Sequence, residues 1–364
     1  MTIAAVVLVV LTLGLAYANG SNDISKGIAT LVGSGVSNLP AAILWGTVWT
    51  VLGGLTAAFA SQELVATFSG NGFLATPVSG HAFLSAVAVG TIAWVVFASR
   101  TGLPVSTTHA IAGSLAGAGI VAQGASSLHW SVLAAKVALP LAVSPLAAVL
   151  LLYAVHPVLQ KALARADRYC VCLERRVAIA PAGAAAMTIV EGPILAPAAD
   201  CDVSPAIAGR IGASDALHWL SSALTSFTRG VNDTPKIVAL GFAAAAAGNV
   251  KGLPFYAAVA VAMATGSLVA GARVTRTLAT KVTPMSPGEG FAANLVTTLL
   301  VGMASLHSLP VSTTHVSSGA IIGIGLHRGG RTVGWKTVRK MLLAWLVTVP
   351  AAAFAAAGLY TLIR

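Results

Sequence analysis

The sequence predicts an all-α integral membrane protein, an inverted-topology repeat of two halves that each hold about three transmembrane helices plus one re-entrant helical hairpin. Three observations support this fold class. Of the 364 residues, 57% are hydrophobic and 9% are charged, whereas a soluble domain carries about 25% charged residues. Two polar motifs each occur twice in the same order. Lys and Arg gather beside the predicted spans instead of being spread along the chain.

The first half is predicted over residues 1–156, where apolar segments of roughly 20 residues are long enough to cross a bilayer. In order, these segments are Met1–Ser37 with an interruption at Asn19–Asp23, Pro40–Ala60, Phe83–Ser99, Val105–Val121 and Trp130–Val155. The first segment lacks the basic start and the small-residue cleavage site of a signal peptide. We therefore expect it to be retained as a helix.

An internal repeat relates the two halves. The hexapeptide PVSTTH begins at Pro104 and again at Pro310, 206 positions later. The stretch NGSNDISKGIA begins at Asn19 and is matched by RGVNDTPKIVA from Arg229, 210 positions later. Two motifs that recur in the same order at nearly the same offset indicate a duplication. The second half is predicted over 214–364, and a basic cytoplasmic linker over 157–213 joins the two.

The placement of basic residues predicts the inversion. Residues 61–99 and 124–130 contain no Lys or Arg, so both loops are expected outside the cell, with the first PVSTTH segment between them as a hairpin. With three crossings and one hairpin in the first half, the second half is expected to have the inverted membrane topology. In agreement, the loops at 272–289 and 327–340 carry eight of the 21 basic residues. Both chain termini are expected on the extracellular side of the cell membrane. Such a repeat is typical of secondary transporters.

The net charge of +11 is explained by these loops, so no nucleic-acid partner is expected. The linker also contains all three cysteines, Cys170, Cys172 and Cys201. An odd number of cysteines on the cytoplasmic side does not favour a disulfide framework. The absence of histidine from residues 157–210 does not favour a metal site, and the role of the cysteines stays open.

Of the ten carboxylates, only Asp23 and Asp233 lie in the middle of apolar segments, and they are repeat mates. An ionisable residue at membrane depth indicates a functional site, although a buried ion pair for stability is the alternative. Neighbouring glycines predict a helix break at each copy, lining a polar cavity. One carboxylate per site, with further oxygen ligands, suits Na+ or a proton. These further ligands are Asn22, Ser25, Asn232 and Thr234. No other cofactor is expected.

Each PVSTTH copy predicts the start of a helix, because Pro favours the first helical position and Ser or Thr caps the free amide groups. A helix N-terminus binds anions through these amides and its dipole. Two such tips entering from opposite faces would hold one tetrahedral oxyanion between them. The hydroxyl residues concerned are Ser106, Thr107, Thr108, Ser312, Thr313 and Thr314. A single copy would be read as an ordinary capping turn, and His109 and His315 as structural residues or proton carriers.

The charges suggest a mechanism. Two carboxylates beside a phosphate or sulfate repel it in a low-dielectric site, so anion binding requires cations or protons at Asp23 and Asp233. That requirement describes a symporter that works by alternating access. Lys26 and Lys236 stand three residues after the aspartates, where one helical turn allows pairing, and each could replace a bound cation. A passive anion channel is an alternative. An intramembrane hydrolase is not favoured, since G-x-S-x-G and H-E-x-x-H motifs are absent from the sequence.

The four motifs resemble those of the inorganic phosphate transporter (PiT) family of sodium- or proton-coupled phosphate permeases. The resemblance covers both halves, through NGSND, GLPVSTTH, RGVND and SLPVSTTH. It implies that Asn22, Asp23, Asn232 and Asp233 serve the cation and phosphate sites and that the six hydroxyl residues hold phosphate. It also implies import of phosphate with Na+ or H+, a homodimer and no enzymatic activity.

The sequence departs from the family pattern at two places. The family motif N-D-V-A-N-A reads NDISKG and NDTPKI here, which introduces Lys26 and Lys236. Asn294 in GFAANL stands where the family often has a glutamate. Because some relatives carry sulfate, the sequence leaves open phosphate or sulfate as substrate and Na+ or H+ as coupling ion.

Overall fold

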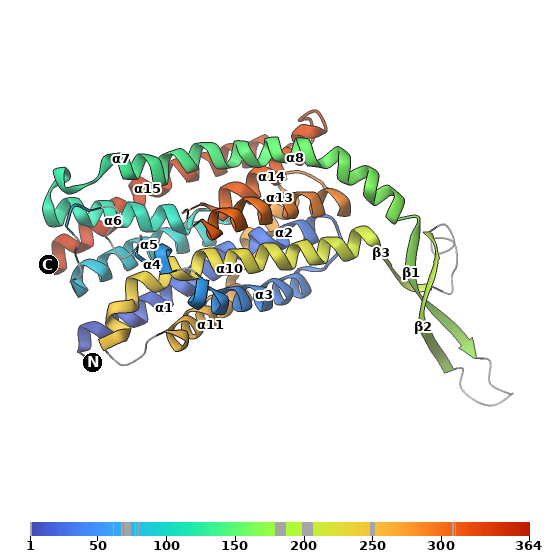
Figure 1. The fold of residues 1–364 in the computed structure, drawn as a ribbon, viewed down its shortest axis with the longest axis horizontal. Helices are drawn as coiled ribbons and strands as arrows, with labels where there is room; N and C mark the ends of the chain where they lie inside the picture. Colours follow the sequence, from blue (N-terminus) through green and yellow to red (C-terminus); the bar gives the residue numbers. More distant parts are fainter. Residues whose placement is uncertain are drawn as a thin grey trace.

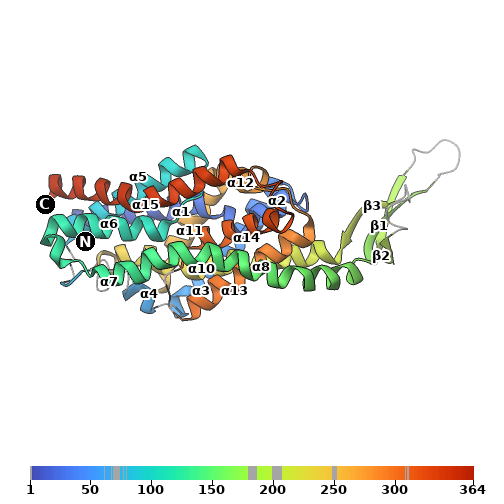
Figure 2. The same ribbon diagram turned by 90° about the horizontal axis from the view of Figure 1, so that it is seen from above.

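The computed structural model of the chain describes residues 2–60, 62–66, 68, 74–76, 78, 80–178, 187–198, 207–247, 252–307, 309 and 311–364. Its helices run mostly along the long axis of an elongated bundle, and a small sheet projects from one end (Figure 1). Both chain termini lie at the opposite end, and the view from above shows the same separation (Figure 2).

The first part of the chain is helical up to the sheet. Its elements are α1 (Ile3–Asp23), α2 (Ser25–Gly33), α3 (Leu39–Ala60), α4 (Gln62–Ala66), α5 (His81–Thr101), α6 (Thr107–Gln123), η2 (Ala125–Ser127), α7 (Trp130–Leu133), η3 (Ala134–Ala138) and α8 (Leu139–Ala166). The sheet consists of β1 (Tyr169–Ala178), β2 (Met187–Pro197) and β3 (Ile207–Gly212). The last part consists of α10 (Ala213–Ala247), α11 (Leu253–Ala270), α12 (Ala272–Thr280), α13 (Pro287–Leu306), α14 (Thr313–His327) and α15 (Trp335–Ile363).

Within these described residues, seven helical segments are long and apolar enough to cross a membrane, with α1 and α2 counted as one. The predicted all-α membrane fold class is therefore confirmed. The observed α3 and α5 begin and end within about two residues of the predicted spans, as expected for strongly apolar segments.

Two helix pairs, α5–α6 and α13–α14, turn back at the PVSTTH motifs. Ser106 caps α6 and Ser312 caps α14, each accepting a hydrogen bond from the amide three residues later. Gly102 ends α5 in the left-handed conformation (φ 76°), which glycine adopts without strain. At 17 and 15 residues, α6 and α14 are shorter than the roughly 20 residues of a perpendicular crossing. Their lengths suit helices that end part-way through the bundle.

The residues Asn19–Asp23, where a helix break was predicted, are helical in α1, and the only irregularity between α1 and α2 is at Ile24, which keeps αR dihedrals (φ −54°, ψ −34°) and donates to the Gly20 carbonyl oxygen. Side chains satisfy the carbonyl oxygen of Asn22 there: Ser25 Oγ donates to it at 2.8 Å and Lys26 Nζ at 2.9 Å. The polar residues that follow Asp23 therefore bind the Asn22 carbonyl oxygen at the junction of the two helices.

The break predicted at the second copy is wrong, because α10 continues through Asp233 as one 35-residue helix. Pro235 lies inside it and removes one backbone donor. Packing against α1, α3, α11 and α13 holds the helix together despite this loss.

The helix contacts recur as corresponding pairs. α1 packs on α5 as α10 packs on α13, and α1 packs on α11 as α10 packs on α3. The short helices are exchanged between halves, since α6 packs on α15 while α14 packs on α8. Neither half can bury its own hairpin without the other.

Glycines permit the closest of these approaches. A Cβ on Gly20 of α1 would lie 1.9 Å from the Met263 carbonyl oxygen of α11, and one on Gly266 would lie 2.0 Å from that of Tyr17. The corresponding α10–α3 contact has the same reciprocal pair, at Gly230 and Gly53. Small residues let membrane helices pack backbone to backbone, where dispersion contacts supply the stability.

The linker contains a three-stranded antiparallel sheet of order β2-β1-β3, which the sequence analysis did not predict. Val171 of β1 is paired with Leu195 on one side and Ile211 on the other. Cys170 and Cys172 are buried with their Sγ atoms 3.1 Å apart, longer than the about 2.05 Å of an S–S bond. The expectation that the three cysteines form no disulfide framework stays a prediction, and Cys201 lies outside the described residues.

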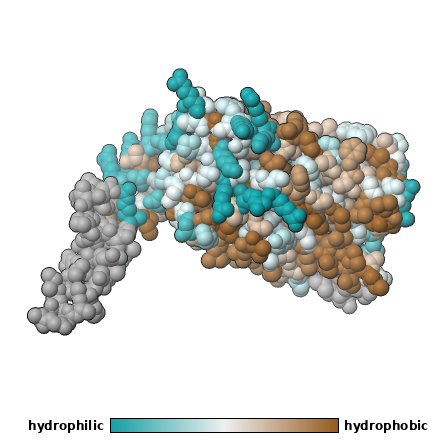
Figure 3. Space-filling view, turned by 180° about the vertical axis from the view of Figure 1, so that it is seen from behind, coloured by the Kyte–Doolittle hydropathy of each residue, from teal (hydrophilic) through white to brown (hydrophobic). Residues whose placement is uncertain are grey.

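The outer surface differs between the two ends. Seen from behind, hydrophobic residues dominate the half that is farther from the sheet, and long hydrophilic side chains gather nearer to it (Figure 3). Exposed large apolar side chains such as Phe59, Leu150 and Phe354 occur along the helices. An apolar surface of this extent suits lipid contact.

We predict that Gly266→Ala destabilises the protein, because its new methyl group would meet the α1 backbone at Tyr17. Overpacking of this kind costs about 1–3 kcal/mol. Thermal unfolding in detergent should show a lower Tm for Gly266→Ala. The control is Gly358→Ala on α15, where no atom lies within 4 Å of the added Cβ; equal Tm values for the two variants would contradict the close α1–α11 packing.

Candidate functional site

Five charged side chains are buried together in the bundle: Asp23, Lys26, Arg229, Asp233 and Lys236, each at most 3% exposed. Burying an unpaired charge in an apolar surrounding is costly, so such groups require partners. All five take part in ion pairs with one another.

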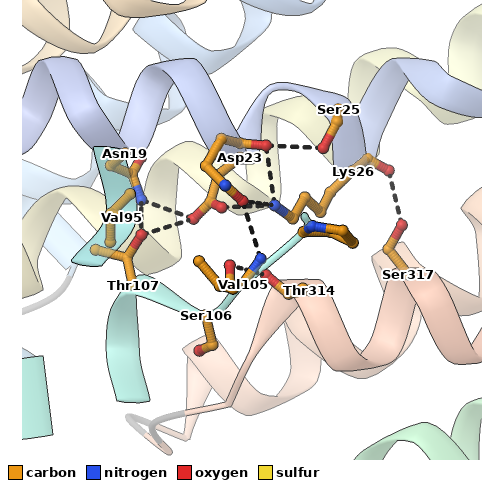
Figure 4. A network of polar contacts seen from close by, with 12 residues as sticks. Asn19, Asp23, Ser25, Lys26, Val95, Val105, Ser106, Thr107, Thr314 and Ser317 are labelled. Carbon is orange, nitrogen blue, oxygen red and sulfur yellow. Dashed lines mark hydrogen bonds and ion pairs between the residues drawn. The ribbon is translucent and has the colours of Figure 1, made fainter. Parts of the chain in front are cut away.

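The first carboxylate, Asp23, is surrounded by donors. Its Oδ1 lies 2.6 Å from Lys26 Nζ. Its Oδ2 accepts hydrogen bonds from Asn19 Nδ2 at 2.8 Å and from Thr107 Oγ1 at 3.1 Å. Figure 4 shows the carboxylate between Lys26 on one side and Asn19 and Thr107 on the other. The predicted one-turn pairing of Asp23 with Lys26 is confirmed.

The second carboxylate, Asp233, has a similar surrounding. Its Oδ1 lies 3.4 Å from Lys236 Nζ and accepts a hydrogen bond from Asn232 Nδ2 at 3.2 Å. The second predicted pairing is thus also confirmed. Lys236 Nζ donates to Thr108 Oγ1 at 2.8 Å, which links the second half to the hairpin tip of the first.

Arg229 and Asn19 join the two carboxylates. Arg229 Nη2 donates to Asn19 Oδ1 at 3.0 Å, and Arg229 Nε lies 3.7 Å from Asp233 Oδ2. Asn19 Nδ2, which binds Asp23, also lies 3.4 Å from Asp233 Oδ2. Asn19 and Arg229 hold equivalent places in the two motifs, so matching positions of the repeat meet at the centre.

Arg229 belongs to the second Asn-Asp motif, but no role was predicted for it from the sequence. A charged residue inside an apolar segment is the signal that would have identified Arg229. Asn19 carries no comparable signal by itself, because its importance comes from Arg229 lying opposite.

The two motif asparagines hold the hairpin loops. Asn22 Nδ2 donates to the Leu103 carbonyl oxygen at 3.0 Å, and Asn22 Oδ1 accepts from the Val105 amide at 3.1 Å. In the same manner, Asn232 Nδ2 donates to the Val311 carbonyl oxygen at 3.2 Å. Each asparagine therefore positions the PVSTTH tip of its own half.

The tips also contact one another. Thr314 Oγ1 donates to the Val105 carbonyl oxygen at 2.8 Å, and the rings of His109 and His315 lie 4.9 Å apart, centroid to centroid. Thr313, like the other predicted hydroxyl residues, is buried. The N-termini of α6 and α14 thus meet beside the charged cluster, as the sequence predicts.

Two of the predicted cation ligands are not brought to the carboxylates. Ser25 Oγ donates to the carbonyl oxygen of Asn22, at the junction of α1 and α2. Thr234 Oγ1 points to Met263 Sδ on α11, at 3.6 Å. Asn294, in the place of the family glutamate, is buried and donates to the carbonyl oxygen of Gly27 on α2 at 3.3 Å.

A sequence profile of the "Phosphate transporter family" matches residues 19–356. The chain belongs to this family. The resemblance stated from the four motifs is therefore confirmed, and phosphate is the substrate of the family. Seven apolar helices together with this membership make the chain a multi-pass membrane protein.

Similar proteins from a bacterium and a plant are named as inorganic phosphate transporters. A protein of Rhizobium meliloti (strain 1021), the "Probable low-affinity inorganic phosphate transporter", is 28% identical over 97% of this chain and 94% of its own length. The "Inorganic phosphate transporter 2-1, chloroplastic" of Arabidopsis thaliana is 29% identical over 93% of this chain and 68% of its own.

A solved structure shares the fold. "The sodium-dependent phosphate transporter" superposes with a TM-score of 0.79 over 99% of both chains, at 22% identity. The similarity extends over the whole transporter, so the arrangement of helices around the buried cluster belongs to a fold already seen in a solved structure.

We predict that Thr314→Val lowers the stability of this transporter, because it removes the hydrogen bond between the two hairpin tips and leaves the buried Val105 carbonyl oxygen without that donor. Such a loss costs about 1–3 kcal/mol. The measurement is Tm in detergent. Thr265→Val is the matched control, since Thr265 is exposed and donates only within its own helix. A Thr314→Val variant as stable as this control would rule out a stabilising tip contact.

Proposed function

We propose that the chain is a secondary active transporter that imports inorganic phosphate together with Na+ or H+ by alternating access, and that it is not an enzyme. The observation that carries the proposal is the meeting of two serine-capped helix N-termini at one buried charged cluster. Relatives named as inorganic phosphate transporters support the choice of substrate.

The anion would bind at the PVSTTH tips. The first turns of α6 and α14 supply amide donors and the positive ends of two helix dipoles. Hydroxyls of Ser106, Thr107, Thr108, Ser312, Thr313 and Thr314 add donors that carry no net charge. Lys236 already contacts Thr108, so a bound phosphate near this hydroxyl lies close to an ammonium group.

Alternating access is supported by the pairing of helix contacts. α5–α6 and α13–α14 have corresponding neighbours in the two halves, and their tips meet while their outer ends point to opposite ends of the bundle (Figure 1). In an inverted repeat, each half reproduces the conformation of the other with the membrane sides exchanged. Rocking one hairpin away from the centre would open the site to one side.

The sidedness and assembly remain predictions. The basic linker is proposed to face the cytoplasm and both termini the outside of the cell membrane, since they lie at opposite ends of the bundle. A homodimer is implied by the family resemblance. Sulfate as substrate and a passive channel are the alternatives; dependence of uptake on an imposed ion gradient separates a symporter from a channel.

We predict that proteoliposomes containing the purified chain accumulate labelled phosphate, and that Thr107→Ala/Thr108→Ala reduces the apparent affinity about tenfold or more. Hydrogen bonds to a charged group contribute about 1.5–3 kcal/mol each. Thr101→Ala is the control, because this exposed threonine of the same hairpin bonds only to its own helix. Unchanged affinity in the double variant would remove the tips from the binding site.

A further inference from the structure

We infer that lysine ammonium groups permanently occupy the two cation sites of this transporter, so that it binds a singly charged, protonated oxyanion such as dihydrogen phosphate without Na+. The inference rests on the proposed phosphate transport and specifies its coupling ion and substrate class. It starts from the oxygen atoms around each lysine.

Lys26 Nζ is held by three oxygens: Asp23 Oδ1 at 2.6 Å, Asn22 Oδ1 at 2.8 Å and the Asn22 carbonyl oxygen at 2.9 Å. One carboxylate, one amide and one main-chain oxygen form the kind of hard oxygen set that binds alkali cations. Here these oxygens surround an ammonium group, which is fully buried.

Lys236 Nζ has a comparable set of three oxygens. Thr108 Oγ1 lies at 2.8 Å, the Val311 carbonyl oxygen at 3.3 Å and Asp233 Oδ1 at 3.4 Å. The two lysines are repeat mates, so both halves carry a cation of their own in the same place. Neither cation can dissociate from the chain.

The second oxygen of each carboxylate is also engaged by donors. Asn19 and Thr107 donate to Asp23 Oδ2, and Asn19 Nδ2 also lies 3.4 Å from Asp233 Oδ2. An amide or guanidinium N–H cannot coordinate a metal cation. Na+ would have to displace these donors from the carboxylates.

The net charge of the five buried residues then determines which charge of the bound anion is favourable. Two lysines balance two aspartates, whether each pair is ionised or has transferred its proton. Arg229 remains as one further positive charge, because a guanidinium stays protonated in proteins. Its equivalent in the first half is the neutral Asn19, so the cluster of five charged residues carries one net positive charge.

A monovalent oxyanion neutralises this cluster, whereas a divalent one leaves a buried negative charge. Burying an uncompensated charge is strongly unfavourable. Dihydrogen phosphate has a single charge and two O–H donors, while sulfate is divalent at neutral pH and has none. Arg229 Nε lacks a hydrogen-bond partner among the described residues and is buried, so one donor beside the cluster is left for an anion oxygen.

The test uses the full-length chain in proteoliposomes with labelled phosphate and an imposed pH gradient. Initial uptake rates in Na+ and in K+ media should agree within about twofold. Arsenate, which is protonated like phosphate, should compete at similar concentrations, and sulfate only at concentrations at least tenfold higher. Stimulation by Na+ of tenfold or more, or equal competition by sulfate, would overturn the inference. Absence of phosphate uptake in every medium would instead refute the proposed transport function.

Lys26→Ala provides a gain-of-dependence test, because it empties the oxygen set around Nζ and leaves Asp23 in place. Uptake by this variant should rise at least tenfold when Na+ replaces K+, and Na+ should raise its Tm. Lys26→Arg keeps the charge and should stay independent of Na+. If Lys26→Ala does not transport, the Tm of this variant is compared in Na+ and in K+. Equal Tm values in the two media would contradict the inference that removing lysine opens a cation site.

Discussion

The cost of burying charge organises the centre of this transporter. Five charged groups lie where the surrounding helices are apolar, and each has an opposite charge within about one turn of its own position. Hydrogen bonds from other helices complete their surroundings. α1, α10 and the tip of α6 must therefore stay in register. A shift of any one of them would break hydrogen bonds that join the buried charges to the neighbouring elements.

This constraint links the hairpins to the charged cluster. Asn22 and Asn232 stand beside the aspartates and hold the loops that precede α6 and α14. Displacing a hairpin therefore disturbs the asparagine, and with it the neighbouring carboxylate. In a transporter of the proposed kind, this connection would make hairpin position depend on the charge state of the site.

Most predicted spans and both hairpin turns match the structure because their signals are local, although α8 runs to Ala166, 11 residues past the predicted end at Val155. Apolar segments of bilayer length form helices in any packing, and Pro and Ser at a helix start act within one turn. Features that depend on contacts with distant parts of the chain were predicted wrongly or not at all. α10 stays continuous at Asp233, since tertiary packing outweighs a local tendency to break. The linker sheet was missed because its strands are stabilised by pairing with each other.

For the site, the sequence by itself determined which polar residues are candidates for the centre of the bundle: the aspartates, the lysines one turn later and the duplicated hydroxyl motifs, all of which are buried there. The one-turn pairings follow from helix geometry, which is the same wherever the helix lies. Only the tertiary structure decided that Lys236 reaches Thr108 of the other half, that Asn19 of α1 reaches Asp233 of α10 and that Arg229 donates to Asn19. These contacts join residues 128 to 214 positions apart, and such separations leave no local pattern in the sequence.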